Sequence, residues 1–188
     1  TMSKLSLKPL VSTAWLGERL GAPGLVLLDA SWYLPTAGRD AEAEYLAAHL
    51  PGARWFDLDA ASDHASPLPH MLPPPAAFAA YAAELGVSDD STVVVYDGSG
   101  NNLTAARVWW MFRLFGHEQV AVLDGGLGKW RAEGRPLERG AVQAEPGRFT
   151  AQVKRAPAGD VDEARLRSPG LLHVLDGHDV DLGRAGVL

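Results

Sequence analysis

Apolar stretches of two kinds alternate along the chain. Continuous apolar runs, such as those at 25–30 and 92–96, are typical of strands that are covered on both faces of a sheet. Longer segments that start near a capping residue, such as Ser12, or a proline, such as Pro75, and stop at a glycine, such as Gly86, are typical of helices. The segments predicted as strands or extended chain are 25–30, 53–59, 92–96 and 119–126. The segments predicted as helices are 11–21, 39–50, 74–86, 105–116 and a short one through Trp130.

Strands that alternate with helices predict an α/β domain with a mainly parallel sheet. We expect this domain to span residues 9–137. Residues 138–160 show no clean apolar period and contain prolines, so they are predicted to be a linker.

The last stretch of the chain echoes the first. Residues 161–177 ("VDEARLRSPGLLHVLDG") repeat the pattern of 11–30 ("VSTAWLGERLGAPGLVLLDA"). Both stretches place an apolar strand after Pro-Gly and then an aspartate, so Asp176 corresponds to Asp29 in the repeat. This internal repeat predicts that 161–188 is the truncated start of a second copy of the domain. A chance similarity between two helix–strand units is the alternative.

Charge and length narrow the classes of partner and compartment. The 188 residues carry a formal net charge of −6, which argues against nucleic acid or an acidic membrane surface as the main partner. No run approaches eighteen apolar residues, and the first ten residues lack the apolar stretch of a secretory signal. These features predict a cytoplasmic protein.

The chain contains no cysteine. Disulfides, thiolate metal sites and a cysteine nucleophile are therefore excluded within these 188 residues. The six histidines show none of the spacings typical of zinc sites, so no metal site is predicted.

A glycine-rich loop separates a strand from a helix in "VVVYDGSGNNLTAARVWW", residues 93–110. In such a turn the backbone N–H groups converge on one point and suit an anion. Asp97 stands where a nucleophile would stand, and a carboxylate there would repel an anion. Leu103 replaces the third glycine of a dinucleotide motif, and no Gly-Lys follows as in a phosphate-binding loop, so no nucleotide cofactor is predicted. A polar strand end with flexible glycines is the alternative.

A second unusual loop, residues 57–75, combines prolines, acids and His70. Prolines can hold side chains in fixed places, so His70 could polarise a nucleophile or transfer a proton, with Asp59 orienting it. A surface loop in which His70 only caps a turn is the alternative. Arg107, at the start of the helix that follows the glycine-rich loop, is predicted to be an anion contact or to form an interface salt bridge.

Three long strings together resemble one known family. "AHLPGARWFDLDAASDHASPLPHMLP", "VVVYDGSG…AARVWWMFRLFGH" and "VLDGGLGKW" closely resemble the first domain of the tandem rhodanese-type sulfurtransferases. The histidine of "PHMLP" is more similar to that of the 3-mercaptopyruvate sulfurtransferases than to the thiosulfate-specific enzymes. The resemblance implies a rhodanese-like α/β fold: a mainly parallel five-stranded sheet with helices on both faces.

The resemblance also implies roles for the candidate residues. In this family the second domain carries a cysteine in its glycine loop and the first carries an aspartate, so Asp97 marks a degenerate nucleophile position. Sulfur passes from 3-mercaptopyruvate or thiosulfate to the cysteine, and the persulfide is discharged to a thiol or cyanide, without a cofactor. His70 and Asp59 are expected to support this chemistry from the first domain.

Other positions depart from the family pattern. Leu103 and Ala106 stand where many relatives have Phe and Pro, and Asp176-Gly177-His178 replaces the usual Asp-Ala-Arg. Without a cysteine the chain alone is expected to be inactive. The competing hypothesis is a catalytically dead rhodanese-like module that binds a partner. Either hypothesis leaves an exposed interface for a second rhodanese domain or for self-association.

Overall fold

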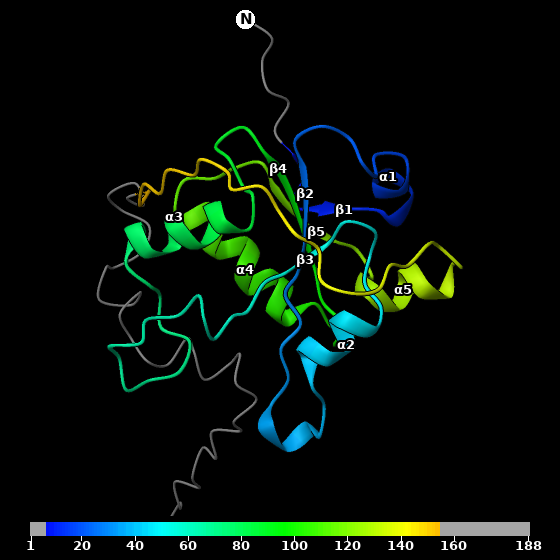
Figure 1. Cartoon of the computed structure of the whole chain (residues 1–188), viewed down its shortest axis with the longest axis horizontal. Coiled ribbons are helices and arrows are strands. Elements are labelled where there is room, and N and C mark those ends of the chain that lie inside the picture. Colours follow the sequence, from blue (N-terminus) through cyan, green and yellow to red (C-terminus); the bar gives the residue numbers. More distant parts are fainter. Residues whose placement is uncertain (1–6, 155–188) are drawn as a thin grey trace, which may run out of the picture. The chain divides into compact units, whose positions relative to one another are not determined.

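A parallel sheet lies at the centre of the computed structural model, which describes residues 7–154 (Figure 1). Its strand order within this region is β1-β5-β4-β2-β3, and every strand pair is parallel. The strands are β1 (Leu10–Val11), β2 (Leu25–Asp29), β3 (Arg54–Trp55), β4 (Thr92–Tyr96) and β5 (Val120–Leu123). The helices are α1 (Thr13–Gly17), α2 (Ala41–Ala47), α3 (Pro75–Glu84), α4 (Leu103–Leu114) and α5 (Gly126–Ala132), with a 3₁₀ turn, η1, at Pro35–Ala37.

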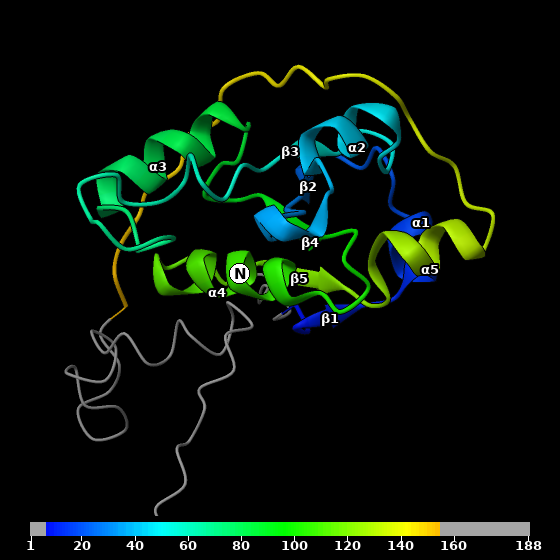
Figure 2. The same cartoon turned by 90° about the horizontal axis from the view of Figure 1, so that it is seen from below.

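Helices cover both faces of the sheet (Figure 2). Successive side chains of a strand point to opposite faces, so Val93 and Val95 pack in one core with α3 and α4. Val94 and Tyr96 pack in a second core that includes Leu16 of α1 and Trp130 of α5. This two-sided burial explains the continuous apolar runs of the inner strands and confirms the predicted fold class.

The amino-terminal segment differs from its prediction. Residues 11–21 were expected to form one helix, but Val11 belongs to the edge strand β1, which pairs with β5, and α1 ends at Gly17. The predicted N-cap is confirmed, because the Ser12 side chain accepts a hydrogen bond from the Trp15 N–H. A two-residue strand is too short to produce a periodic pattern, and Leu10 is 56% exposed, so the sequence contains little signal for β1.

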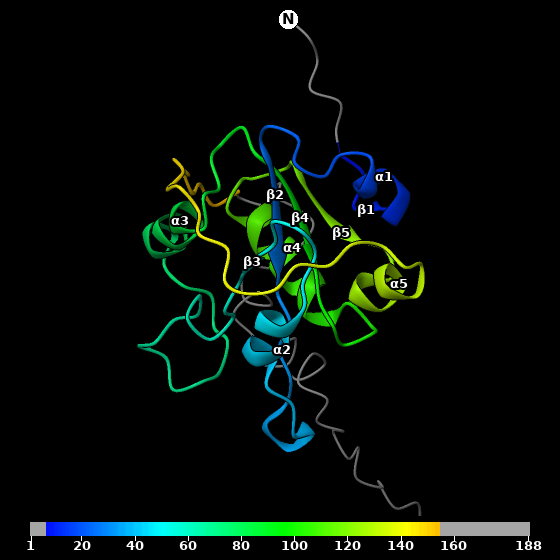
Figure 3. The same ribbon diagram turned by 45° about the vertical axis from the view of Figure 1, so that its right-hand side comes forward.

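The compact unit continues past residue 137, where the domain was expected to end. Residues 138–154 contain no helix or longer strand, yet they cross the domain past β3 to α3 (Figure 3). Glu138 and His49 exchange two backbone hydrogen bonds, Gly147 N–H donates to Ala83 O, and Gln152 N–H donates to Phe115 O. The ring of Phe149 is only 8% exposed and packs among Phe78 and Phe112.

This part of the predicted linker is therefore a strap attached to the domain, and the predicted second copy, including Asp176, lies outside the described residues. Within residues 7–154, no helix has the length and apolar character needed to cross a membrane.

Candidate functional site

Four loops meet at one edge of the sheet, because parallel strands all end at the same side. Asp29 ends β2, residues 57–74 follow β3, Asp97 follows β4 and Asp124 follows β5. The two loops singled out in the sequence are therefore brought to the same edge. This carboxyl edge is where ligands bind in open α/β sheets.

The anion site predicted at the glycine-rich loop between β4 and α4, which we call the cradle, is filled by the carboxylate of Asp97 itself. Its Oδ1 accepts hydrogen bonds from the backbone N–H of Ser99 at 2.9 Å and from the Ser99 hydroxyl at 2.6 Å. Its Oδ2 accepts from the Ala105 N–H at 2.9 Å, in the first turn of α4. The side chain is buried, with the residue 1% exposed. Asp97 thus binds the N–H groups that an external anion would need. It also caps α4, because the side chain of the N-cap residue Asn102 makes no capping hydrogen bond.

A buried network supports this loop from β2. The Ser31 hydroxyl donates to Asp29 Oδ1 at 2.6 Å and accepts from the Gly98 N–H at 2.9 Å. Burial raises the pKa of Asp29, and the nearby charge of Asp97 raises it further, while the bonds from Ser31 oppose this shift. Ser31 therefore accepts a hydrogen bond from one more N–H group of the cradle loop, that of Gly98.

His70 and Asp59 lie in contact, as the sequence suggested. Nε2 of His70 lies 2.6 Å from Oδ1 of Asp59, and the imidazole and the ring of Trp32 form a T-shaped pair with a centroid distance of 4.7 Å. His70 is 9% exposed, whereas the Asp59 side chain is 67% exposed. The Asp59 loop is itself ordered by Asp57, whose Oδ1 accepts from the Asp59 and Ala60 N–H groups. The pair combines a nearly buried imidazole with an open carboxylate.

The backbone of His70 adopts a left-handed conformation with φ of 53°. Such a conformation costs about 1 kcal/mol or more for a residue with a Cβ, so the surrounding contacts must hold it. Arg107, predicted as an anion or interface contact, donates from Nη2 to the carbonyl oxygen of His70 at 2.6 Å. Its guanidinium also lies over the ring of Trp110 at 5.0 Å. Helix α4 therefore touches both loops: Ala105 binds Asp97, and Arg107 binds His70.

The segment that follows β2 also contributes to the site, and its role was not predicted from the sequence. Ser31, Trp32 and Tyr33 approach the cradle loop or His70, and burial raises the pKa of Tyr33 to about 12. A Cβ on Gly98 would lie 2.7 Å from the Tyr33 hydroxyl oxygen, so a larger residue there would require the Tyr33 side chain to move. The available signal was the string "DASWY", in which hydroxyl and aromatic residues directly follow a buried strand that ends at this edge.

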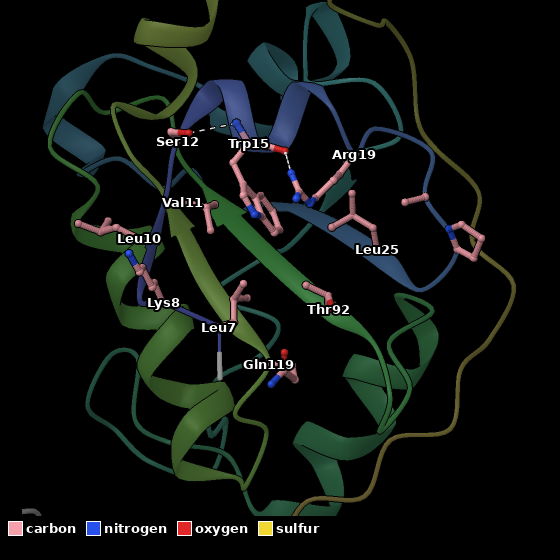
Figure 4. A pocket seen from close by; sticks show the side chains of 12 residues that line it. Leu7, Lys8, Leu10, Val11, Ser12, Trp15, Arg19, Leu25, Thr92 and Gln119 are labelled. Carbon is pink, nitrogen blue, oxygen red and sulfur yellow. Dashed lines mark hydrogen bonds between the residues drawn. The ribbon is translucent and has the colours of Figure 1, made fainter. Parts of the chain in front are cut away.

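A separate hollow lies at the opposite edge of the sheet (Figure 4). Its volume is about 680 Å³, and Leu25 and Thr92, the first residues of β2 and β4, line it together with Trp15, Lys8 and Arg19. None of the predicted site residues lines this hollow. Within residues 7–154, no group of three or more histidine or acidic side chains is placed to hold a metal ion.

A comparison with protein families decides the classification. Residues 12–133 match the family model of the rhodanese-like domain. The chain belongs to the rhodanese-like domain family. This confirms the family suggested by the three sequence strings, and the fold of the rhodanese-like domain is the one described above.

Related proteins of known activity match this rhodanese-like domain closely. The 3-mercaptopyruvate sulfurtransferase of Rattus norvegicus is 51% identical over 151 residues, covering 78% of this chain and 51% of the relative. The thiosulfate sulfurtransferase of Bos taurus is 49% identical over 154 residues, covering 79% of this chain and 52% of the relative. The crystal structure of SseA from Escherichia coli, a 3-mercaptopyruvate sulfotransferase, superimposes with a TM-score of 0.76 at 42% identity, covering 89% of this chain and 62% of that one.

The chain thus spans about half the length of the curated relatives it matches. Relatives named for either sulfur donor are similar to it to nearly the same degree, so identity does not separate the two donors.

Proposed function

We propose that this rhodanese-like domain is the supporting half of a sulfurtransferase that moves sulfur from 3-mercaptopyruvate, or thiosulfate, to a thiol or cyanide acceptor. The names of its relatives support the reaction class. The 188 residues contain no cysteine, and Asp97 takes the loop position that a nucleophile would need. The sulfur-carrying cysteine therefore belongs to a second rhodanese-like domain that pairs with this one.

The reaction has two steps on that cysteine. Its thiolate attacks the sulfur atom of 3-mercaptopyruvate, the C–S bond breaks, and the electron pair leaves with the pyruvate enolate, which takes up a proton. The thiolate of an acceptor, or cyanide, then attacks the outer sulfur of the persulfide. The S–S bond breaks and the cysteine thiolate is restored, so no cofactor is consumed.

His70 serves as the proton carrier of this reaction. When Nε2–H donates to Asp59 Oδ1, Nδ1 keeps its lone pair and can accept a proton. The Asp59 carboxylate orients the ring and stabilises the imidazolium that forms. The observation that carries the proposal is this pair, a nearly buried imidazole 2.6 Å from a carboxylate, beside a cradle whose own N–H groups are taken by Asp97.

A chimera tests the proposal. Residues 1–154 replace the matching region of the Escherichia coli 3-mercaptopyruvate sulfurtransferase, which is 46% identical to this chain over 159 residues. We expect the chimera to convert 3-mercaptopyruvate and cyanide into thiocyanate, and the 188-residue chain alone to form none. His70→Ala should lower the rate of the chimera by roughly 100-fold, the scale of a lost proton-transfer group.

His64→Ala is the matched control, because His64 is an exposed histidine of the same loop. It should leave the rate unchanged. Thiocyanate formation by the 188-residue chain alone, or a His70→Ala chimera as fast as its parent, contradicts the proposal. A folded chimera that forms no thiocyanate also contradicts it and favours a binding module that has lost the activity of its relatives.

A further inference from the structure

Among the described residues, His70 and Asn102 are the only ones other than glycine that have a positive φ. Asparagine adopts this region readily because its short side chain can bond locally, whereas histidine lies there at a cost in free energy. His70 also follows Pro69, whose ring fixes its own φ and so limits how the chain can enter this position. Something outside the loop must therefore stabilise this peptide.

A hydrogen bond from a charged donor on another element reaches that peptide. Arg107 Nη2 donates to the His70 carbonyl oxygen at 2.6 Å, although the two residues are 37 positions apart. A hydrogen bond from a charged donor is about twice as strong as a neutral one. The arginine side chain is half-buried, and its guanidinium lies over Trp110, one turn along the same helix.

The hydrogen bond from Arg107 to the His70 carbonyl oxygen affects where the imidazole ring points. With the carbonyl bound to α4, the backbone of His70 is held in place, and its ring contacts both Asp59 and Trp32. If the carbonyl were released, the peptide could relax to a negative φ and turn the ring away from Asp59. A shift of about 1 Å in a catalytic group can lower a rate by roughly 100-fold.

We propose that Arg107 is a positioning residue that holds the His70 backbone in its left-handed conformation and so aims the imidazole at Asp59. This inference rests on the proposed function for its kinetic consequence, but the effect on the ring exists in the chain alone. It assigns Arg107 a role through the carbonyl of His70, and it excludes direct binding of the substrate anion as its main role.

The first test uses the 188-residue chain and no enzyme assay. Nitrogen-15 NMR of the histidine rings distinguishes Nε2–H from Nδ1–H tautomers. We expect His70 of the parent chain to be the Nε2–H tautomer, and Arg107→Met to give averaged ring shifts. Arg113→Met is the matched control, since Arg113 lies over Trp109 on the same helix at 5.3 Å. It should leave the His70 signals unchanged.

The second test uses the chimera described above. Arg107→Met should lower kcat by roughly tenfold or more and change KM by less than about twofold, because positioning acts on the reacting group and not on substrate affinity. If Arg107→Met fails to fold, both tests are repeated with Arg107→Gln. The glutamine side chain is polar like arginine, but its amide is too short to reach the His70 carbonyl oxygen.

The outcomes separate the two proposals. An unchanged His70 tautomer in Arg107→Met overturns the positioning role whether or not the chimera is active. A raised KM with an unchanged kcat also overturns it and indicates an anion contact. If the chimera is inactive while the NMR change is observed, the proposed function fails and the structural role of Arg107 stands.

Discussion

Two loops at the same edge of the sheet each carry an aspartate, and the two carboxylates are used in opposite ways. Asp97, after β4, is 1% exposed and accepts three hydrogen bonds from its own loop and from α4. The side chain of Asp59, after β3, is 67% exposed and contacts His70. The Asp97 carboxylate stabilises the fold through internal hydrogen bonds, whereas the Asp59 carboxylate remains accessible to solvent.

This contrast shows that the shape of an anion cradle does not by itself identify a binding site. Converging N–H groups attract an anion from solution only if they lack an internal acceptor. Here the chain supplies that acceptor as a side chain. The loop around His70 shows the reverse arrangement, in which a backbone conformation of high energy is retained beside an exposed carboxylate. Three substitutions in these loops and behind them test this contrast.

The largest effect on stability is expected at the cradle. Asp97→Ala leaves the buried N–H group of Ala105 and the partly buried N–H group of Ser99 without their acceptor, and the loss of an acceptor costs a buried donor about 1–3 kcal/mol. We expect the free energy of unfolding, measured by urea titration with circular dichroism, to fall by about 3 kcal/mol. Asp124→Ala is the matched control, because Asp124 follows β5 at the same edge but is exposed. It should change stability by less than about 0.5 kcal/mol.

A loss below about 1 kcal/mol in Asp97→Ala would mean that water or another group satisfies these N–H donors. The cradle would then be open to ligands, and the contrast between the two loops would disappear.

An intermediate effect, dependent on pH, is expected at Asp29. Because burial raises the pKa of this carboxyl above its ordinary value of 3.8, the folded state keeps the proton to a higher pH than the unfolded state does. The resulting stability is fully present below pH 3.8 and is lost as the pH rises through the raised pKa. Asp29→Asn has no proton to lose, so its stability relative to the parent should improve between pH 4 and pH 7.

Urea titrations of both proteins at several pH values measure this difference, and other carboxylates cancel because both proteins contain them. A stability difference that does not change with pH, or that changes in the opposite direction, would show that Asp29 stays ionised in the fold.

The smallest effect on stability is expected at the open carboxylate. Asp59→Asn changes a pair in which one partner is mostly exposed, and such pairs contribute about 0–1 kcal/mol. We expect a loss below about 0.5 kcal/mol in the same urea titration, together with a lower rate in the chimera assay. A loss as large as that of Asp97→Ala would show that both loops use their carboxylates to stabilise the fold.

Much of the fold could be predicted from local patterns. The runs at 25–30 and 92–96 indicated inner strands because helices cover both faces of the sheet, and Ser12, Pro75 and Gly86 marked true helix ends. The edge strand β1 and the strap at 138–154 were not predicted. Both are held by backbone pairing with distant residues and by isolated apolar side chains such as Phe149, which produce no periodic pattern.

The amino-acid sequence determined the α/β alternation, the absence of cysteine, and the types of side chain placed after each strand, because these depend on composition and local spacing alone. The partner that each of these side chains contacts depends instead on how the helices and loops pack in three dimensions. Asp97 was expected to repel an anion, but the packing of α4 against the sheet turned the Ala105 N–H toward it. The same packing brought Arg107 to the carbonyl of His70, a contact between elements far apart in the chain, for which short-range spacing carries no information.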